Sequence, residues 1–448
     1  MNDKMYNMNG AGGNAWRDGL VAACLFWTPA TNLVVHHGSG IGFFLLLAIS
    51  LYTAYQRRND ATYFAPLRRY RIFTVAMAAL LVVVLAQEVV QHAWRPREFD
   101  APSRFVLALP IFLLLCDVRV RHLKAIGWGC AAGAVGAAVW AVIDRPAAGW
   151  TDMVRLGNYY TNQIPFGDTA LLLAFLSAST LGWDDGRGRT LAWIAKGAAL
   201  VTGIDLSYLS GSRGGWIAIP LLVALLAFEY RWFSDWKRLA SAVLIVIVAV
   251  TAALSTERVQ SRIAAARSDV ALFQHGSKDT SIGLRLQLWR ASIRLFRAHP
   301  VWGVGKGRLT GAFGALAKRG EVDPAIVNAR AHSDFFSALA EAGVVGAAGL
   351  LFFYAGTAAA FWRNRRSDDR VIRTASCAGL SATLSTVIFG LTIDVLVPIM
   401  EVTLLALMYA SLLAMIEARR RELAGSVADG PSFRDDTGCC SSGRANLV

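Results

Sequence analysis

Long apolar segments recur along almost the whole chain, and they constrain its fold more than any other feature. Hydrophobic residues make up 55% of the 448 residues, and the mean hydropathy is +0.43. About twelve segments are long enough, or nearly so, to cross a bilayer as a helix of about 20 residues. We place them at 19–35, 39–56, 72–94, 102–120, 124–144, 162–182, 190–209, 214–231, 238–256, 334–362, 372–395 and 397–417. The sequence therefore predicts an all-α polytopic membrane protein of about 12 transmembrane helices and argues against a soluble domain.

Basic residues gather in alternate short loops, and this pattern predicts the orientation of the chain. They follow the second, fourth, eighth, tenth and twelfth segments, as Arg57, Arg58, Arg68, Arg69, Arg71, Arg119, Arg121, Lys124, Arg231, Lys237, Arg238, Arg363, Arg365, Arg366, Arg370, Arg373 and Arg419 to Arg421. Because short basic loops stay in the cytoplasm, we expect both chain ends inside and the long loop 257–333 outside. The N-terminus has no basic region before a cleavable apolar core, so we expect no removable signal peptide.

This topology divides the chain into four parts. Residues 1–256 hold the first nine helices, and residues 257–333 form an outer loop with amphipathic helices. Residues 334–417 hold the last three helices, and residues 418–448 form a polar cytoplasmic tail that we expect to be disordered.

The outer loop is strongly basic, with roughly 13 Lys and Arg residues against 5 acidic residues. The inside-positive bias explains the rest of the formal net charge of +14, but it does not explain this excess. A basic surface can bind nucleic acid, yet a position between membrane spans argues against such a partner. The cysteines show neither a disulfide pattern nor metal-ligand spacing, and no Walker-type loop or serine nucleophile elbow occurs. We therefore expect no metal and no cofactor.

Residues 283–298 have the period of an amphipathic helix that ends before Pro300. Its apolar side is formed by Leu284, Leu288, Ala291, Leu295 and Phe296, and its basic side by Arg290, Arg294 and Arg297. Such a basic stripe is typical of a surface that faces solvent or lipid headgroups, although we keep Arg290 as a supporting candidate. Arg285 differs, because it lies toward the apolar side, where a guanidinium is costly unless it meets an anion. Its planar set of donors suits a phosphate or pyrophosphate.

His332 stands immediately before the apolar segment 334–362, where Ser333 or Asp334 can cap a helix. The first turn of a helix favours anions, and an imidazole there has a tunable pKa and can act as a general base. A single His at a membrane edge is more often structural, so the catalytic interpretation depends on its surroundings.

Arg213 lies in the Gly- and Ser-rich break 209–216, which also faces outward. Glycine lets the backbone approach a ligand closely, and the simpler alternative is a tight turn with an interfacial Arg. Carboxylates within or near apolar segments are further candidates, with helix–helix hydrogen bonding as the alternative. They are Glu88, Asp205, Glu341, Asp394 and Glu401.

Three motifs resemble the signature of the O-antigen ligase and polymerase superfamily. They are Arg-Leu-Gln-Leu-Trp at 285–289, His-Pro-Val-Trp-Gly-Val-Gly-Lys-Gly at 299–307 and Ala-His-Ser-Asp-Phe-Phe-Ser-Ala-Leu-Ala-Glu-Ala-Gly at 331–343. The motifs cover about 60 residues, and the arrangement of spans around one large outer loop extends the resemblance to most of the chain. The resemblance implies a metal-independent, GT-C-like glycosyltransferase at the periplasmic face of the bacterial inner membrane.

The resemblance also implies roles for individual residues. His332 matches the family His, with Ser333 in place of the commoner Asn, and Arg285 matches the loop Arg. Arg213 matches an Arg of the earlier outer loop. Glu341 belongs to the Glu-x-Gly element, which we interpret as structural.

In such an enzyme, a glycan leaves undecaprenyl pyrophosphate and joins an acceptor hydroxyl. Arg285 and Arg213 would neutralise the leaving pyrophosphate, and His332 would deprotonate the acceptor, which implies inversion at the anomeric carbon. In a ligase the acceptor is the lipid A-core oligosaccharide, so the lipid-linked donor, this acceptor and membrane lipids are the expected partners.

Other functions remain open at this point. A related polymerase or an O-linked oligosaccharyltransferase would use the same donor. The short polar tail after Glu417 favours the ligase over protein-modifying relatives, which often carry a sizeable domain there. A transporter would use its intramembrane carboxylates, but it predicts two related halves, and we find none in the sequence.

Overall fold

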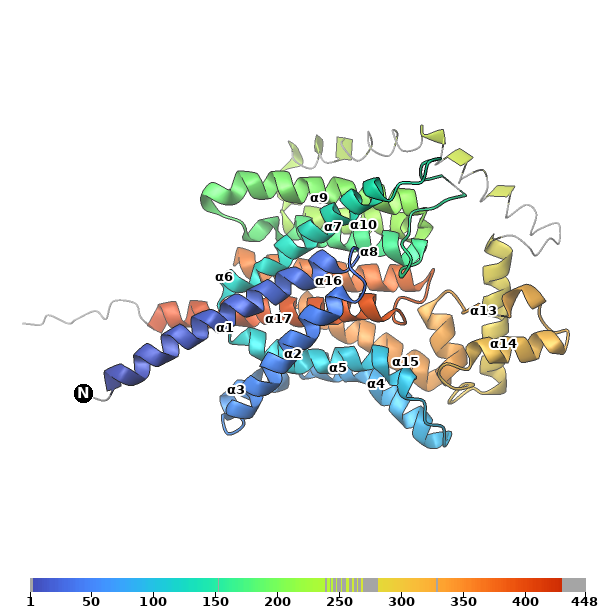
Figure 1. Ribbon diagram of the computed structural model, residues 1–448, viewed down its shortest axis with the longest axis horizontal. Helices are drawn as coiled ribbons and strands as arrows, with labels where there is room; N and C mark the ends of the chain where they lie inside the picture. Colours follow the sequence, from blue (N-terminus) through green and yellow to red (C-terminus); the bar gives the residue numbers. More distant parts are fainter. Residues whose placement is uncertain are drawn as a thin grey trace, which may run out of the picture.

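The structure is a computed structural model, and every regular element in the residues that it describes is a helix (Figure 1). It describes residues 3–428, apart from residues 152 and 328 and most positions between 238 and 280. The α-helices are α1 (Asp3–Thr31), α2 (Gly38–Gln56), α3 (Ala61–Arg69), α4 (Arg71–Val90), α5 (Asp100–Cys116), α6 (Val120–Leu123), α7 (Ala125–Ile143), α8 (Gln163–Ser179), α9 (Arg189–Ser210), α10 (Arg213–Glu229), α13 (Ser281–Ala298), α14 (Leu309–Lys318), α15 (Asp334–Trp362), α16 (Arg370–Gly390) and α17 (Ile399–Ala428).

Eight of the described helical segments are long and apolar enough to cross a membrane, which supports a multi-pass membrane protein. They are Gly38–Gln56, Arg71–Val90, Pro96–Cys116, Val120–Ile143, Gln163–Trp183, Asp334–Trp362, Arg370–Gly390 and Ile399–Ser426. Three further predicted segments coincide with α1, α9 and α10, which are not among the helices long and apolar enough to cross a membrane. Helix α10, for example, has only 17 residues. The predicted segment 238–256 falls largely outside the described residues. The count of about 12, the division into four parts and the GT-C likeness therefore stay predictions.

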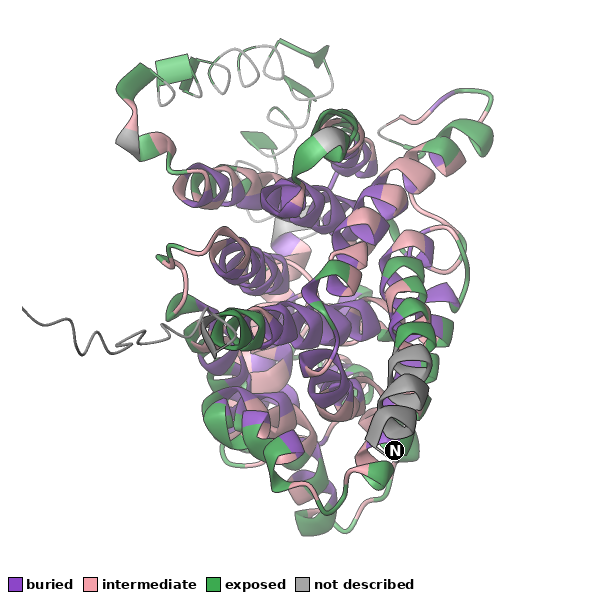
Figure 2. Ribbon diagram, turned by 90° about the vertical axis from the view of Figure 1, so that its left-hand side faces the viewer, coloured by how far each residue is buried: buried purple, intermediate pink, exposed green. Residues whose placement is uncertain are grey.

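The helices differ in how much of their surface is covered by other helices. Buried residues make up 89%, 78% and 83% of the apolar stretches of α8, α16 and α17, but only 33% of that of α4. Figure 2 shows the buried residues gathered in the middle of the bundle. Along α4, Val75, Val82 and Val89 are 56%, 57% and 62% exposed. Because these residues lie seven apart, they form one apolar stripe of the kind that a bilayer covers.

Helices α13 and α14 lie at one end of the bundle and share a small core with the start of α15 (Figure 1). Leu288, Leu295, Phe313 and Ala340 belong to that core, and none is more than 7% exposed. Helix α13 confirms the predicted amphipathic helix at 283–298, because its apolar side packs into this core while its basic stripe is exposed. The core fixes the outer loop against the beginning of α15.

Helix α15 is interrupted at Gly343, whose φ of 63° and ψ of −152° lie outside the helical region. Backbone groups beside such a break lose their partners within the helix, and in apolar surroundings they must find others. The segment 300–305 of the outer loop supplies these partners. The hydrogen bonds run from Val304 N–H to Ala340 C=O (3.0 Å), Gly305 N–H to Glu341 C=O (2.9 Å), Val344 N–H to Pro300 C=O (2.9 Å) and Val345 N–H to Val301 C=O (3.4 Å).

Two glycines at this junction leave no room for a side chain. A Cβ atom on Gly343 would lie less than 3.0 Å from the Val301 carbonyl oxygen, and one on Gly303 would lie equally close to the Glu341 carbonyl. Gly303 also has a positive φ of 62°. The Gly-rich motif at 299–307 and the Glu-x-Gly element are therefore the two sides of one junction.

We expect Gly343→Ala to destabilise the protein by about 3 kcal/mol or more, because backbone strain adds to a clash with the outer loop. Thermal unfolding of the detergent-solubilised protein should show a clearly lower Tm. Gly311 in α14 is a matched control, since open space surrounds the position of its Cβ atom. Gly311→Ala should leave the Tm unchanged or raise it slightly. An unchanged Tm for Gly343→Ala would contradict the described junction.

Candidate functional site

His332 lies where the outer loop meets α15, and its φ of 50° is positive. Its two neighbours fix the backbone: the Trp289 indole N–H donates to the Ala331 carbonyl over 3.2 Å, and the Ser333 hydroxyl donates to the Gly390 carbonyl over 3.2 Å. The predicted side-chain cap by Ser333 is wrong, because Ser333 occupies the N-cap position of α15 but makes no capping hydrogen bond. His332 is therefore held between α13 and the end of α16.

The surroundings of His332 favour its neutral form. Burial lowers the pKa of His332 below its ordinary value of 6.5, the positive charges of Arg285 and Arg330 lower it further, and Asp394 opposes the shift. Because the charged imidazolium is destabilised, the neutral imidazole prevails at neutral pH. The neutral imidazole is the form that accepts a proton.

Arg285 of α13 interacts electrostatically with His332 and with Asp168 of α8. Asp168 also accepts a 2.5 Å hydrogen bond from the Ser212 hydroxyl. Ser212 in turn caps α10, because its side chain accepts a hydrogen bond of 3.3 Å from the Gly215 N–H. In this structure the neighbour of Arg285 is thus a carboxyl group of the chain itself, and binding of a phosphate or pyrophosphate by Arg285 stays a prediction.

Arg213 is the first residue of α10, and its side chain lies outside the described part of the structure. Close packing fixes its backbone, since a Cβ atom on the next residue, Gly214, would lie less than 3.0 Å from the Thr392 hydroxyl. Thr392 belongs to the connection between α16 and α17, which also carries Asp394. Asp168 and this connection therefore bring the backbone of Arg213 to the end of the bundle where Arg285 and His332 lie.

Arg290 lies elsewhere. It is exposed on α13, about 140° around the helix axis from Arg285. This position fits the alternative of a stripe that faces solvent or headgroups better than the predicted supporting role beside His332.

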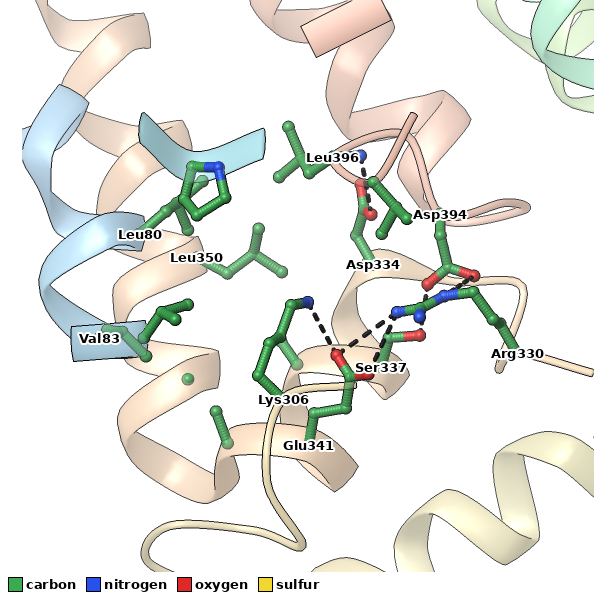
Figure 3. A pocket seen from close by; sticks show the side chains of 16 residues that line it. Leu80, Val83, Lys306, Arg330, Asp334, Ser337, Glu341, Leu350, Asp394 and Leu396 are labelled. Carbon is green, nitrogen blue, oxygen red and sulfur yellow. Dashed lines mark hydrogen bonds and ion pairs between the residues drawn. The ribbon is translucent and has the colours of Figure 1, made fainter. Parts of the chain in front are cut away.

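Glu341 is fully buried beside the break in α15, and two cations from the outer loop reach it (Figure 3). Lys306 Nζ lies 2.8 Å from its Oε2, and Arg330 Nη2 lies 3.3 Å from its Oε1. Arg330 Nε also lies 3.6 Å from Oδ2 of Asp394, whose other oxygen accepts a hydrogen bond from Ser337. Because these contacts join the outer loop to the span, they support the structural interpretation of Glu341.

Lys306 and Arg330 were not predicted as site residues. The available signal was Glu341 itself, because a carboxylate inside an apolar segment needs a cation or several hydrogen bonds. The identity of that cation could not be read from the sequence, since Lys306 lies 35 residues away from Glu341 and becomes its neighbour only through the break in α15.

Two cavities adjoin these charges. The first, of about 70 Å³, has the charged side chains of Figure 3 on one wall and apolar side chains such as Leu80 and Val83 of α4 on another. The second, of about 30 Å³, lies among α8, α16 and α17 and is lined by Asp168, Asp394 and Glu401. Asp394 lines both cavities. Among the described residues, no group of three or more His, Cys, Asp or Glu side chains could hold a metal ion.

Comparison with known proteins points to one family. Residues 198–351 match a family model described as O-antigen ligase. The match supports assignment to the O-antigen ligase and polymerase family. The matched region begins in α9 and ends in α15, so it contains Arg213, Arg285, His332 and Glu341. Because this is a family of membrane glycosyltransferase-like enzymes, the match also supports an enzymatic role.

An uncharacterized protein of Haemophilus influenzae is 25% identical over 218 residues, which are 47% of this chain and 52% of that protein. The chain thus spans about half the length of this curated relative. This similarity adds no activity, and the reaction must be argued from the family match and from the site.

The charge of Glu341 should matter for stability. We expect Glu341→Gln to cost about 3 kcal/mol in the free energy of unfolding, because it leaves Lys306 without its buried anion and leaves Arg330 with Asp394 alone. Glu321→Gln is a matched control, since Glu321 pairs with Arg294 at 3.2 Å and Arg319 at 2.7 Å but is 35% exposed. Glu321→Gln should lower the free energy of unfolding by less than about 1 kcal/mol. Equal Tm values for the two variants in detergent would argue against a stabilising role for the Glu341 network.

Proposed function

We propose that the protein is an O-antigen ligase, which transfers a glycan from undecaprenyl pyrophosphate to lipid A-core oligosaccharide at the periplasmic face of the inner membrane. The proposal rests on the position of Arg285 close enough to His332 for its charge to lower the pKa of the imidazole. A cation beside a neutral imidazole suits a reaction with an anionic leaving group and a hydroxyl acceptor. The family match across both residues supports the same reaction.

The proposed reaction is a single displacement. The acceptor hydroxyl oxygen attacks the anomeric carbon while the bond from that carbon to the pyrophosphate oxygen breaks. The bonding electrons leave with undecaprenyl pyrophosphate, and the hydroxyl proton passes to a nitrogen of His332. Arg285 and Arg213 stabilise the charge that develops on the leaving group. Because no residue of the chain forms a covalent intermediate, the anomeric configuration inverts.

The donor is an anion, and Arg285 already has the carboxyl group of Asp168 as an electrostatic neighbour. Asp168 therefore holds Arg285 in place when no substrate is bound and competes with the pyrophosphate when it is. A pyrophosphate carries more negative charge than one carboxylate, so it can draw Arg285 away from Asp168. The Ser212 hydroxyl, 2.5 Å from Asp168, keeps that carboxylate hydrogen-bonded during the exchange.

Complementation tests the function and its two leading residues together. The chain is expressed in a ligase-deficient Gram-negative host with a matching O-antigen pathway, and lipopolysaccharide is examined on gels. We expect wild type to restore the high-molecular-weight ladder. In His332→Ala and Arg285→Ala, at equal membrane levels of the protein, the amount of high-molecular-weight lipopolysaccharide should fall by about 100-fold or more. Arg297→Ala is the matched control, because it removes an exposed arginine of the same helix and should leave the ladder intact.

The acceptor is tested in the same experiment. If wild type leaves lipid A-core unmodified while polymeric undecaprenyl-linked glycan accumulates, the ligase proposal is wrong in its acceptor. Longer lipid-linked glycans that depend on the chain would instead identify a polymerase, and glycosylated Ser or Thr would identify an oligosaccharyltransferase.

The pH dependence follows from the lowered pKa of His332. Because the neutral imidazole is the active form, the rate should stay constant near neutral pH and fall to half at a pH below 6.5. In Arg285→Gln, the loss of a positive charge raises the pKa of His332, so the midpoint of the residual activity should move to higher pH. Initial rates in proteoliposomes with purified donor and acceptor measure both curves. The same acid midpoint in the residual activity of His332→Gln would assign the base to another group.

A further inference from the structure

A cavity lined by four arginines lies at the end of the bundle opposite α13 and α14 (Figure 1). It has a volume of about 430 Å³ and is bounded by the junction of α3 and α4, the end of α15 and the last turns of α17. We call it the arginine pocket; it is lined by Arg69, Tyr70, Arg71, Ile72, Phe73, Ala359, Ala360, Arg363, Asn364 and Arg420.

The positive charge of the arginine pocket is largely uncompensated. None of its lining residues is acidic, and Arg69 alone of the four arginines forms an ion pair within the described part of the chain, with the buried Glu417 at 2.5 Å. Arg420 donates to two neutral groups, the Tyr70 hydroxyl at 3.0 Å and the Asn364 amide oxygen at 2.5 Å. Arg71, Arg363 and Arg420 are exposed residues that line one cavity, and no carboxylate is among its lining residues. Several guanidinium groups around one cavity provide the planar donors that suit phosphate oxygens.

The apolar part of the pocket follows from the packing of α4 against α15. The two helices touch at Gly356, where a Cβ atom would lie 2.5 Å from that of Ala76 and 3.4 Å from the Ile72 carbonyl oxygen. Beyond this contact, the small residues Ala359 and Ala360 leave space between the helices. The arginines surround this space, so the pocket combines a basic rim with an apolar wall.

The residues around the pocket indicate that it lies at the level of the lipid headgroups. Trp362 lies next to the pocket residue Arg363, is 54% exposed, and carries the Arg365 guanidinium 3.6 Å from its ring centre. Exposed Trp residues mark the interface between bilayer and water. From the pocket, α4 exposes Ile72 and Val75 by 51% and 56%, which continues the apolar wall toward the bilayer. A ligand with a phosphate and acyl chains would use both parts, whereas a free phosphate would use only the rim.

We propose that the arginine pocket binds the phosphodiester headgroup of an anionic glycerophospholipid from the adjacent leaflet. The phosphate lies among Arg71, Arg363 and Arg420, and an acyl chain follows α4 past Ile72. The site does not depend on the proposed glycosyl transfer, because it lies at the other end of the bundle and shares no residue with it.

Native mass spectrometry of the purified full-length protein tests the site with phosphatidylglycerol as the probe. The variant Arg71→Gln/Arg363→Gln removes two arginines of the rim. The control Arg68→Gln/Arg366→Gln removes two exposed arginines at neighbouring positions that do not line the pocket. We expect the affinity for the most tightly retained lipid to fall about thirtyfold in the first variant and less than about threefold in the control.

A second variant tests whether lipid binding needs the cavity itself and not only positive charge at the surface. Ala359→Trp fills the space between α4 and α15 without changing any charge, and it should also weaken phosphatidylglycerol binding. The proposal would be overturned if the two arginine double variants lost phosphatidylglycerol affinity equally, or if neither lost it. It would also be overturned if wild type retained zwitterionic phosphatidylcholine as well as phosphatidylglycerol. Displacement of phosphatidylglycerol by inorganic phosphate at similar concentration would assign the pocket to a free anion instead of a lipid.

Discussion

The arrangement of the outer part of this protein depends on the pairing of a few buried backbone groups beside Gly343. A continuous α15 would have satisfied its own backbone, and the segment 300–305 would then lose the hydrogen bonds that add to the apolar core in holding the outer loop against the span. Because α15 is broken, its carbonyl and N–H groups bind the segment 300–305. That register brings Lys306 to Glu341. The position of the loop is thus set by backbone hydrogen bonds, and the side-chain charges follow from it.

The basic residues of the outer loop have different roles, which depend on how deeply each is buried. Lys306 and Arg330 neutralise carboxylates inside the span, where an unpaired charge would cost several kcal/mol. Arg290 and Arg297 are exposed and screened by solvent. Arg285 stands between these cases, since it has a carboxylate neighbour in Asp168 yet also acts on His332. The excess charge of the loop is therefore not a uniform basic surface.

The sequence was sufficient for features that depend on local periodicity. Eight of the twelve predicted apolar segments coincide with described helices that are long and apolar enough to cross a membrane, and the spacing of Leu288 and Leu295 predicted the buried face of α13. It also placed His332 at the start of α15. It could not predict the Lys306–Glu341–Arg330 network, because those contacts depend on a break that no local pattern requires. The Ser333 cap failed for a related reason: a hydroxyl at an N-cap has several acceptors within reach, and here the Gly390 carbonyl of another helix binds it.

Arginines occur at both ends of the bundle, and nearby carboxylates distinguish their roles. At the end that carries the outer loop, Arg330 faces Glu341 and Asp394, so its charge holds the fold together. At the opposite end, the rim formed by Arg71 and Arg363 faces no carboxylate within the described residues. Arg71 and Arg363 are exposed, so solvent screens part of their mutual repulsion, and a bound anion would screen it further. Within the described residues, three of the four arginines of the arginine pocket form no ion pair, and this is the physical reason to look for a ligand there, whereas Arg330 already has its carboxylates.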